Sequence, residues 1–585
     1  MKTSIVILTH NKWEYTQGCI ESIRQYTEQG TYEIIVVDNA STDRTQEWLA
    51  DQSDIICIFN DHNVGFPKGC NQGIGVASGD NILLLNNDVI VTTGWLENML
   101  KALYSSESIG AVGPITNNAV YYQNMEVNYS SLEEMQEFAR DYNNHDPNKW
   151  EMRLKLVGFC MLIKGTAVQS VGLLDEQFTP GNFEDDDYSF RLLEAGYKLL
   201  FCKDTFVHHF GHTTFKDNPS GYREIMKQNQ NKFNEKWGFD SLYSSYIRSD
   251  VVEMMDAHPA DQTIRVLEIG CACGGTLLKI KNQYKNAELY GIELNPHSAE
   301  IAALFAQVSA SNVEHDLDYP EKFFDYIIFP DVLEHLNDPW SVLRSMKRYL
   351  KPRGKVLASI PNVMHYTVLK DLISGRWTYT DAGLLDRTHL RFFTLAEIQL
   401  MFEATGYHNM KYNARVTTPN ESEQDWISKL TALGGPEFEA QYKVYQYLVK
   451  AENSNILESV KKIVDELGSD AGNGETVSEL VSLLINDDIG YQDISEAIDT
   501  STVNKQTVCN QLAIAFYKSG YHDLIIPLLQ KSLSINSKDR DTLFNLGYIL
   551  HLAHENELAL FYLDQIAIQD DDTAQLIEQI RQLSH

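Results

Sequence analysis

The strongest constraint on the fold is an alternation of short apolar runs and helical stretches that occurs twice along the 585-residue chain. The first block covers residues 1 to about 215, and the second runs from about residue 262 to about residue 415. Strands that alternate with helices predict mostly parallel sheets with helices packed on their faces. We therefore expect an α/β multidomain protein with domains over residues 1–250, including a closing helix, and 251–415.

The last part of the chain has a different pattern. From about residue 420, Leu, Ile and Ala recur at helical spacing, and strand-like runs are no longer apparent. Pairs such as Leu512 and Leu546, or Ile526 and Leu560, repeat at about 34 residues, the period of tetratricopeptide helix pairs. This predicts an all-α helical-repeat domain over residues 416–585, which would serve for self-association or for binding a partner protein.

Composition narrows the choice of partners and compartment. The formal charge is −33, with 81 acidic against 48 basic residues, which argues against nucleic acid as a partner. No apolar run approaches the ~18–20 residues of a membrane span, and the N-terminal run is shorter than the about 7–15 residues of a signal-peptide core. Eight cysteines without a CxxC pair indicate reduced thiols. We expect a cytoplasmic protein with no integral membrane segment.

Polar residues follow the expected strands of the first block. Thr9 and Asp38 each end a strand, where open α/β sheets bind their ligands. Asn87 and Asp88 follow a later strand, and a carboxylate there suits Mg²⁺ or Mn²⁺ on phosphates. The alternatives are ordinary local roles: a turn and cap at Asp38, and an Asx turn at Asn87 and Asp88.

A glycine-rich segment, NVGFPKGCNQG over residues 63–73, lies between two of these strands. It holds Asn63, Lys68 and Asn71 just before an expected helix. Backbone amides at a helix start, together with a lysine, bind a diphosphate. The segment alone is weak evidence, and its place between two sheet strands strengthens it.

Four consecutive acids, Glu184 to Asp187, stand at another expected helix start. Helix-dipole stabilisation explains acids there, but four adjacent charges repel one another beyond what capping requires. Such crowding raises the pKa of one carboxyl, which suits a general base. His208, His209 and His212 follow the next strand and indicate a metal or pyrophosphate site.

These segments, in their order, resemble the family 2 glycosyltransferases with the GT-A fold: ILTHN, VVDNASTD, NVGFPKGCNQG, LNND, FEDDDYSFR and VHHFG. The resemblance implies a nucleotide-diphospho-sugar donor and inversion at the anomeric carbon. It implies Thr9 and Asp38 at the nucleobase, Asp185 as catalytic base, and a divalent metal at Asp88 with His208 or, less surely, His209. Asn86 replaces the first acid of the family's DxD-type motif. The acceptor would be a glycan, a lipid-linked sugar or a protein such as a flagellin or surface-layer subunit.

The second block opens with VLEIGCACGGTLL, a strand, a glycine-bearing turn and a helix start. Glu293 ends the next strand, at the spacing of an acid that bonds a ribose. The first ligand to consider for this pattern is the dinucleotide NAD. The motif is not GxGxxG, however, because it places Glu268, Gly270, Ala272 and Gly274 at alternate positions.

That spacing resembles the class I S-adenosylmethionine-dependent methyltransferases, which have a Rossmann-like fold, and the match continues through DVLEHL and LKPRGKVLASIPN. The resemblance implies a cofactor site, with Asp331 and His335 on its methyl-transfer side and Asp316 beside the adenine. Its cofactor-binding residues would be Glu268, Gly270, Gly274, Glu293, Asp316 and Asp331. The segment GLLDRTHLRFFT also resembles this group, and its Asp386, His389 and Arg391 would position an acceptor.

Methylation of a hydroxyl needs a base near that hydroxyl and a pocket that excludes water. His335 and His389 are the candidates, with a purely structural role as the alternative for His389. The leading hypothesis is a bifunctional enzyme that transfers a sugar and then methylates that sugar or its neighbour. The alternatives are a chain in which one domain is a degenerate binding module, and a scaffold built on the helical tail.

Overall fold

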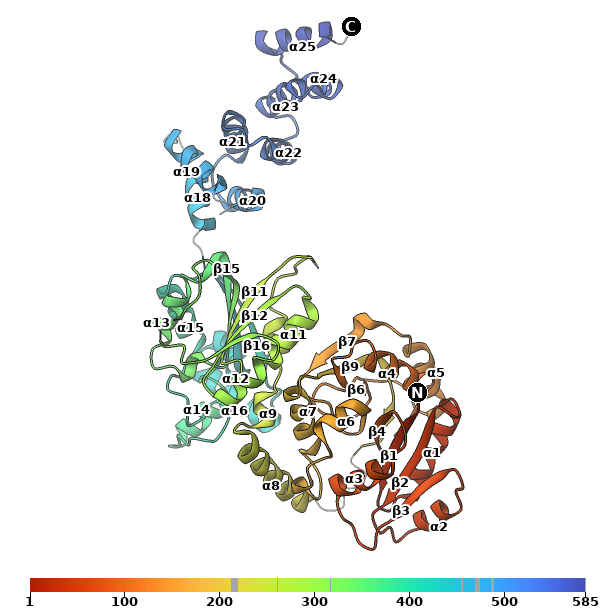
Figure 1. Ribbon diagram of the computed structural model, residues 1–585. Coiled ribbons are helices and arrows are strands. Elements are labelled where there is room, and N and C mark those ends of the chain that lie inside the picture. The colour runs from red at the N-terminus through yellow and green to blue at the C-terminus, as the bar shows by residue number, and fades with distance from the viewer. Residues whose placement is uncertain are drawn as a thin grey trace.

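The computed structural model describes residues 1–211, 219–259, 261–315, 317–453, 456–468, 474–485 and 489–583. It contains two α/β domains followed by a helical C-terminal region, which confirms the expected fold class (Figure 1). Within these residues, no helix combines the length and the apolar character needed to cross a membrane.

The first domain is built on an eight-stranded sheet with the order β3-β2-β1-β4-β8-β6-β9-β7. Strands β1 to β4 run parallel, whereas β8 and β7 are antiparallel to their neighbours. The strands are β1 (Thr3–Thr9), β2 (Tyr32–Asp38), β3 (Ile55–Phe59), β4 (Asn81–Asn86), β6 (Ile109–Ile115), β7 (Trp150–Arg153), β8 (Cys160–Lys164) and β9 (Lys198–Phe206). A separate two-stranded pair joins β5 (Val89–Ile90) to β10 (His208–His209).

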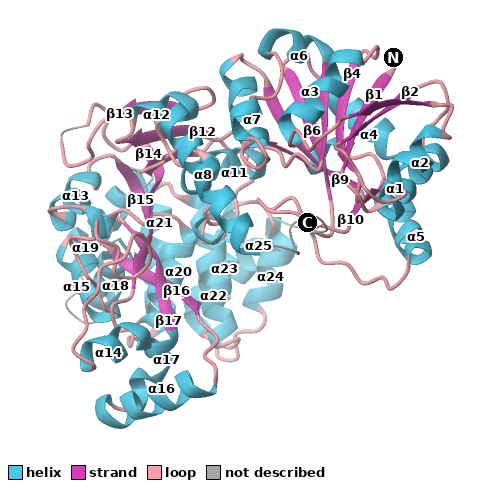
Figure 2. Ribbon diagram, turned by 90° about the horizontal axis from the view of Figure 1, so that it is seen from below, coloured by secondary structure: helices cyan, strands magenta, loops and turns pink. Residues whose placement is uncertain are grey.

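Helices cover both faces of this sheet because the side chains of each strand alternate between the faces. They are α1 (Trp13–Tyr26), α2 (Thr45–Ala50), α3 (Phe66–Val76), α4 (Trp95–Leu103), α5 (Leu132–Tyr142), α6 (Gly165–Val171), α7 (Glu184–Glu194) and α8 (Pro219–Trp237). Val6 packs in one core cluster with Cys70 of α3, whereas Ile5 packs in the other with Ile20 of α1. Figure 2 shows the strands between α3 and α6 on one side and α1 on the other.

The second domain is a seven-stranded sheet with the order β13-β12-β11-β14-β15-β17-β16. The strands are β11 (Arg265–Ile269), β12 (Glu288–Glu293), β13 (Gln307–Ala310), β14 (Phe324–Pro330), β15 (Leu350–Pro361), β16 (His408–Val416) and β17 (Val444–Glu452). Its helices are α9 (Ser241–Ser244), α10 (Ser249–Val252), α11 (Gly275–Gln283), α12 (Pro296–Ala302), α13 (Pro339–Met346), α14 (Tyr366–Ile373), α15 (Leu395–Ala404), α16 (Glu421–Gly434) and α17 (Glu439–Lys443).

The sheet of the second domain extends beyond the boundary expected at residue 415. Strand β17 lies between β15 and β16 and is antiparallel to both. Its side chains Val449 and Ala451 belong to the core of that domain. The expected boundary therefore falls before the last strand, and the expectation that strands end near residue 420 is corrected.

The C-terminal region is all helix. It comprises α18 (Ile456–Leu467), α19 (Gly474–Ile485), α20 (Tyr491–Thr500), α21 (Lys505–Ser519), α22 (Ile525–Ile535), α23 (Arg540–Leu552), α24 (Asn556–Leu563) and α25 (Asp571–Leu583). Leu512 and Leu546, one repeat apart in the expected pattern, are both buried in the same cluster. Figure 1 shows this tail extending from the second domain, and an ion pair between Arg353 and Asp493 (2.6 Å) joins the two.

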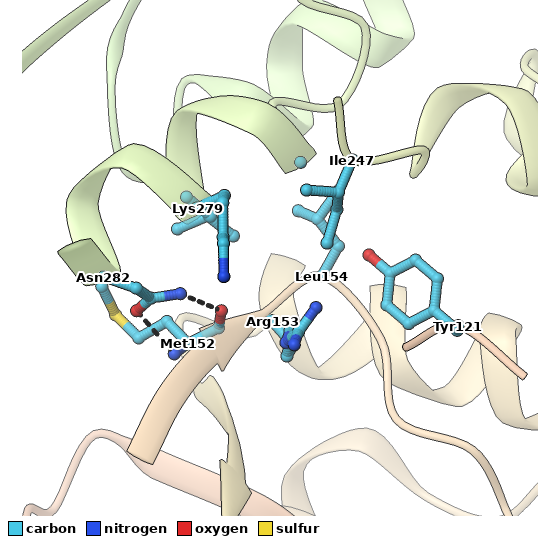
Figure 3. Close-up of a pocket in the computed structure, with 9 residues that line it drawn as sticks. Tyr121, Met152, Arg153, Leu154, Ile247, Lys279 and Asn282 are labelled. Atoms are coloured by element: carbon cyan, nitrogen blue, oxygen red, sulfur yellow. Dashed lines mark hydrogen bonds between the residues drawn. The ribbon is translucent and has the colours of Figure 1, made fainter. Parts of the chain in front are cut away.

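The two α/β domains are locked together. The edge strand β7 meets α11, and the Asn282 side chain exchanges two hydrogen bonds with the backbone of Met152, at 2.9 and 3.0 Å (Figure 3). One apolar cluster contains Phe190 and Trp237 of the first domain side together with Leu278 of the second. A shared core of this kind holds domains in one relative orientation, unlike a polar linker.

Candidate active sites

The carboxyl ends of the central strands bring Thr9 and Asp38 side by side, because these two residues are paired in the β1–β2 register. Both are buried. The Asp38 Oδ2 atom accepts hydrogen bonds from the Ser41 amide (3.0 Å) and from Gln46 (2.6 Å). Its Oδ1 atom is buried and has no hydrogen-bond partner among the described residues. A buried carboxylate oxygen in this state is destabilising, and an N–H group of a bound ligand would satisfy it.

The glycine-rich segment forms the turn that starts α3. Gly65 has a φ of +87°, and a Cβ atom there would lie 2.7 Å from Thr179, so this turn requires glycine. Asn63 caps the turn by accepting the Gly65 amide at 2.9 Å. Lys68 is exposed. Asn71 instead points into the protein and donates to the Leu174 carbonyl at 2.9 Å.

The β5–β10 pair places the histidines against Asp88, since His209 pairs with the residue that follows this aspartate. The His209 Nε2 atom lies 3.2 Å from the Asp88 Oδ1 atom. The His209 Nδ1 atom is 2.7 Å from the Asn118 carbonyl, so Nδ1 carries the proton in that bond. Nε2 then faces a carboxylate, and only a proton or a cation can lie between them. The pair can therefore hold either a shared proton or a divalent cation.

His208 has a different environment from its neighbour. Its Nδ1 atom lies 2.6 Å from the Tyr129 hydroxyl. Burial, together with the electrostatic influence of the neighbouring His209, lowers the pKa of His208 to about 4, so this ring is neutral at pH 7. Asp88 thus contacts His209 directly, although the resemblance favours His208. His212 lies outside the described residues. Asn87 donates to Thr9 (3.3 Å) and Thr16 (3.1 Å), which fixes the same strand end.

The four consecutive acids separate into four environments at the start of α7. Asp186 pairs with Lys155 at 2.7 Å, and Asp187 pairs with Arg191 at 2.8 Å and with Lys236 at 2.6 Å. These two carboxylates are structural.

Asp185 and Glu184, by contrast, make no ion pair with a lysine or arginine among the ion pairs of the described residues. The Asp185 Oδ2 atom accepts the Gly158 amide at 2.8 Å, and Gly158 directly precedes Phe159, whose ring stacks on His209. Burial, together with the negative charge of Asp186, raises the pKa of Asp185 to about 6. Glu184 is buried as well, and burial and Asp185 raise its pKa well above the usual value. A carboxyl that titrates near neutrality suits a general base.

In the second domain, the loop after β11 is a tight turn with three residues of positive φ. Gly270 and Gly274 have φ values of +68° and +81°, which favour glycine. A Cβ atom on Gly270 would lie 2.8 Å from Val332. Ala272 also has a positive φ, of 46°, and its amide donates to the Glu293 Oε2 atom at 2.8 Å. The loop and the end of β12 are therefore tied together.

Three acids lie around this loop, of which Glu268 is buried and Glu293 and Asp331 are partly exposed. Glu268 is 2% exposed, and burial raises its pKa to about 8. Glu293 also accepts the Asn295 amide, at 2.8 Å. Asp331 follows β14 with a φ of 56° and accepts a hydrogen bond from Ser359 at 3.0 Å. Asp316 lies outside the described residues.

The motifs did not point to two residues of the segment that joins the domains. Arg248 is buried and pairs with Asp331, and it also donates to Ser359 at 2.9 Å. Tyr243 of α9 lies within electrostatic reach of Asp331 and Glu293. Neither residue belongs to a glycine-rich or acidic motif, so only the fold brings them to this site.

His335 and His389 meet although 53 residues separate them. Their ring centroids are 4.8 Å apart, at an angle of 76°. His335 lies in a short 3₁₀ helix (Leu333–His335) after β14, and His389 lies in the loop that precedes α15. Asp386 lies near both rings and accepts the Thr388 amide at 2.8 Å. The two candidate bases therefore lie side by side, just beyond the carboxyl end of β14.

Comparisons with known proteins agree with this architecture. Residues 4–177 match the family described as glycosyl transferase family 2, and residues 239–412 match a methyltransferase domain family. The chain joins a family 2 glycosyltransferase domain to a methyltransferase domain. Both enzyme classes are thus represented in one polypeptide.

Individual relatives match one part of the chain each. The ubiquinone biosynthesis O-methyltransferase of Idiomarina loihiensis is 25% identical over 30% of this chain and 75% of that protein. Glycosyltransferase GlyG of Streptococcus pneumoniae is 25% identical over 34% of this chain and 68% of that protein. Among solved structures, the mannosyltransferase PcManGT of Pyrobaculum calidifontis matches with a TM-score of 0.31 and 14% identity, over 52% of this chain and 73% of that one.

Proposed function

We propose that the chain is a bifunctional transferase: the first domain transfers a sugar from a nucleotide-diphospho-sugar to a hydroxyl, with inversion, and the second domain methylates a hydroxyl of that sugar. The acceptor would be a glycan, a lipid-linked sugar or a protein. The observation that carries the proposal is the environment of Asp185, whose acidic neighbours on its C-terminal side are neutralised by cations while its own pKa is about 6.

In the sugar transfer, Thr9 and Asp38 would bind the base, with the unpartnered Asp38 Oδ1 atom accepting an N–H group. The glycine-rich turn and Lys68 would hold the diphosphate. Asp185 would take the proton of the acceptor hydroxyl as the hydroxyl oxygen attacks the anomeric carbon. Asp88 and His209, with His208 nearby, would hold a Mn²⁺ or Mg²⁺ ion, which stabilises the charge of the leaving nucleoside diphosphate when it is bound.

In the methyl transfer, Gly270 and Gly274 would line the methionine part of S-adenosylmethionine and Glu293 would accept from its ribose hydroxyls. Glu268, buried in β11 just before the glycine-bearing loop, would support that loop. Asp331 would border the methyl group, and its contacts with Arg248 and Ser359 fix the orientation of its carboxylate. The acceptor hydroxyl would lie on the side of His335 and His389.

The locked domains support a shared substrate. Separate activities would be served by a flexible linker, yet β7 and α11 exchange hydrogen bonds and the domains share an apolar cluster. The eight cysteines are free in the structure, which agrees with a reducing compartment such as the cytoplasm, where nucleotide sugars and S-adenosylmethionine are made. We propose that compartment as the site of action.

The test is mass spectrometry of the products that the full chain makes from a panel of nucleotide sugars, with and without S-adenosylmethionine. We expect a mass increase of one sugar, and of one methyl group more when the methyl donor is present. Asp185→Asn is expected to lower sugar transfer by about 10²–10⁴-fold, and Glu293→Ala to lower methyl transfer alone. Sugar transfer at the full rate in Asp185→Asn would contradict the assignment of the base.

A second candidate function keeps one domain as a binding module without catalysis. Asn86 stands where the metal motif has an acid, and Ala272 has a positive φ in the cofactor loop. If this candidate holds, the same experiment yields one of the two mass increases and never the other. A calorimetric titration then shows whether the silent domain still binds its nucleotide.

A further inference from the structure

A cluster of three side chains in the methyltransferase domain has the composition of a metal site. Glu334, His335 and His389 each offer a ligand atom, and these atoms lie within 4.8 Å of one another. Three atoms bound tetrahedrally to one cation at about 2.0–2.2 Å lie about 3.5 Å from each other. Binding of a cation would therefore draw the three side chains closer together.

The state of Glu334 is the first observation that points to a ligand. Its side chain is 1% exposed, and neither of its carboxyl oxygens has a hydrogen-bond partner among the described residues. An ionised carboxylate without partners in this position is strongly destabilising, so the group either stays protonated or binds a cation. Its backbone carbonyl is the part that contributes structure, because it accepts the amides of Leu390 and Arg391.

The two histidines supply the second observation. The Nδ1 atom of His335 lies 3.2 Å from the Thr388 carbonyl, and the Nδ1 atom of His389 lies 3.2 Å from the Leu384 carbonyl. A carbonyl accepts only, so both rings carry their proton on Nδ1 when they are neutral. The Nε2 lone pairs are then available. Histidines that bind metals through Nε2 typically donate Nδ1–H to a carbonyl or carboxylate in this way.

The surrounding charges favour a cation at this place. Asp331 and Asp386 both lie close enough to Glu334 to repel its negative charge. Arg248 also lies within electrostatic reach of Glu334, but it forms an ion pair with Asp331. Asp386 then leaves a negative potential beside the two imidazoles. A bound divalent ion would compensate it.

We propose that Glu334, His335 and His389 form a binding site for a divalent metal ion in the methyltransferase domain, with Zn²⁺ as the expected ion. Two imidazoles and one carboxylate suit such ions, and three protein ligands leave a position open. Resting on the proposed methyl transfer, the open position would take the acceptor oxygen and make its hydroxyl more acidic. The hydroxyl proton leaves to water, the oxygen bonds the methyl carbon, and the electrons of the carbon–sulfur bond stay on sulfur.

This site changes the expected role of the histidines. A ring that binds a cation through Nε2 and donates through Nδ1 cannot also accept a proton from the substrate. His335 and His389 would then be ligands, and the acidity of the metal-bound hydroxyl would replace a general base.

The test uses Co²⁺ as the probe and the full chain carrying Asp88→Asn, which removes the other candidate metal site. We expect about one Co²⁺ per chain, with visible absorption bands from nitrogen and oxygen ligands. Glu334→Gln and His335→Asn are each expected to weaken Co²⁺ binding by more than the about 10–100-fold of an outer-shell residue. His297→Gln, which changes an exposed histidine of the same domain, is the control and should bind as the parent does.

S-adenosylmethionine binding, measured by calorimetry, reports on the fold of each variant. His335 is half-buried, so its replacement disturbs the packing less than a change at Glu334. Unchanged Co²⁺ affinity in a variant that still binds S-adenosylmethionine would overturn the site, as would the absence of Co²⁺ binding in the parent. Neither result depends on methyl transfer. The metal site can therefore be disproved while the proposed function stands, and the proposed function can be disproved while the metal site stands.

Discussion

Adjacent carboxyl groups in this protein have different partners, and their protonation behaviour differs for that reason. Asp185 and Asp186 are neighbours in the first turn of α7, yet Asp186 contacts Lys155 and Ser241, while Asp185 accepts hydrogen bonds from the backbone amides of Gly158 and Asp186. Separate environments for neighbouring acids are the usual way in which proteins assign one of them to acid–base chemistry.

The first prediction concerns the pH dependence of sugar transfer. Burial and Asp186 raise the pKa of Asp185 to about 6, and only the deprotonated carboxylate can accept a proton. The kcat/KM for sugar transfer should therefore rise with pH through about 6 and level off above it. A pH–rate profile of the full chain measures this.

The control for that profile is Asp187→Asn, in the same helical turn. Asp187 binds Arg191, Lys236 and Trp237, so its loss should lower stability without moving the acid limb. A profile that is flat between about pH 5 and pH 8, or a dead Asp187→Asn with an active Asp185→Asn, would show that the wrong acid is assigned.

A second prediction at this scale concerns Glu268 and stability. Burial raises its pKa from 4.5 to about 8, so between these values the folded chain holds a proton that the unfolded chain has released. The contribution of Glu268 to stability is therefore largest below about pH 4.5 and falls as pH rises towards 8. Glu268→Gln cannot titrate, so the melting temperature of the variant relative to the wild type should increase from pH 5 to pH 8. A constant difference would contradict the raised pKa.

The sequence predicts which residue types stand at the strand ends, but not their partners. Asp38 and Glu293 follow apolar runs that any reader can see, and open α/β sheets place such residues at one edge. The choice between His208 and His209 depends on the β5–β10 pairing, a two-residue element with no pattern of its own. Lys155 and Lys236 neutralise two of the four acids from distant segments, which no local signal reveals.

At the scale of elements, the joining segment contacts residues beside both candidate sites. Ser241, at the start of α9, bonds Asp186 of the glycosyltransferase domain, while the next turns bring Ser244 to the Cys273 amide (3.0 Å) of the cofactor loop. Arg248 then reaches Asp331. One short stretch of chain thus contacts the neighbour of the expected base and the expected cofactor site.

The third prediction tests this connection through Lys155. Its ammonium group is buried with Asp186 at 2.7 Å and also contacts Ser241 at 3.0 Å. Lys155→Met leaves a buried carboxylate without its cation, which typically costs about 3–5 kcal/mol. We expect the first thermal unfolding transition to fall by several degrees in calorimetry.

Two matched variants check this interpretation. Lys203→Met removes a more exposed lysine that pairs with Glu151, and it should change the transition little. Adding Asp186→Asn to Lys155→Met removes the uncompensated charge and should restore part of the loss. An equal effect of Lys155→Met and Lys203→Met would rule out a special role for the buried pair.

Strand β17 shows which element the sequence hides. Its residues 444–452 follow two helices, α16 and α17, and join an otherwise parallel sheet as an antiparallel strand. Parallel α/β units are recognised by regular strand–helix alternation, whereas a late antiparallel strand breaks that order. The helical spacing of the tail, by contrast, was a reliable signal because it extends over many turns.

At the scale of the whole molecule, the shared core fixes how the two candidate sites are placed relative to each other. Phe190, Trp237 and Leu278 pack in one cluster, so neither domain can be removed without exposing apolar surface. The sites therefore keep a fixed separation. Tethering raises the effective concentration of one site's product at the other only if that product can reach it. In a rigid arrangement, the sugar-bearing product would reach the second site either because the acceptor is a long chain or because it is released and bound again. A movement of one domain relative to the other would not deliver it.

The last prediction follows from this order of events. Given a nucleotide sugar, an acceptor and labelled S-adenosylmethionine, the full chain should place label only on acceptor that already carries the sugar. When Asp185→Asn is supplied with acceptor that carries no sugar, labelling should fall together with sugar transfer, by about 10²–10⁴-fold, because the substrate of methylation is hardly made. The same variant, supplied with acceptor glycosylated beforehand by the wild type, should regain labelling at close to the wild-type rate, because its methyltransferase domain is intact. Chromatography of the products with radiochemical detection measures both results. Label on the bare acceptor in equal amount would mean that the two domains act on unrelated substrates, and failure of the pre-glycosylated acceptor would mean that α7 and the joining segment transmit the damage to the second site.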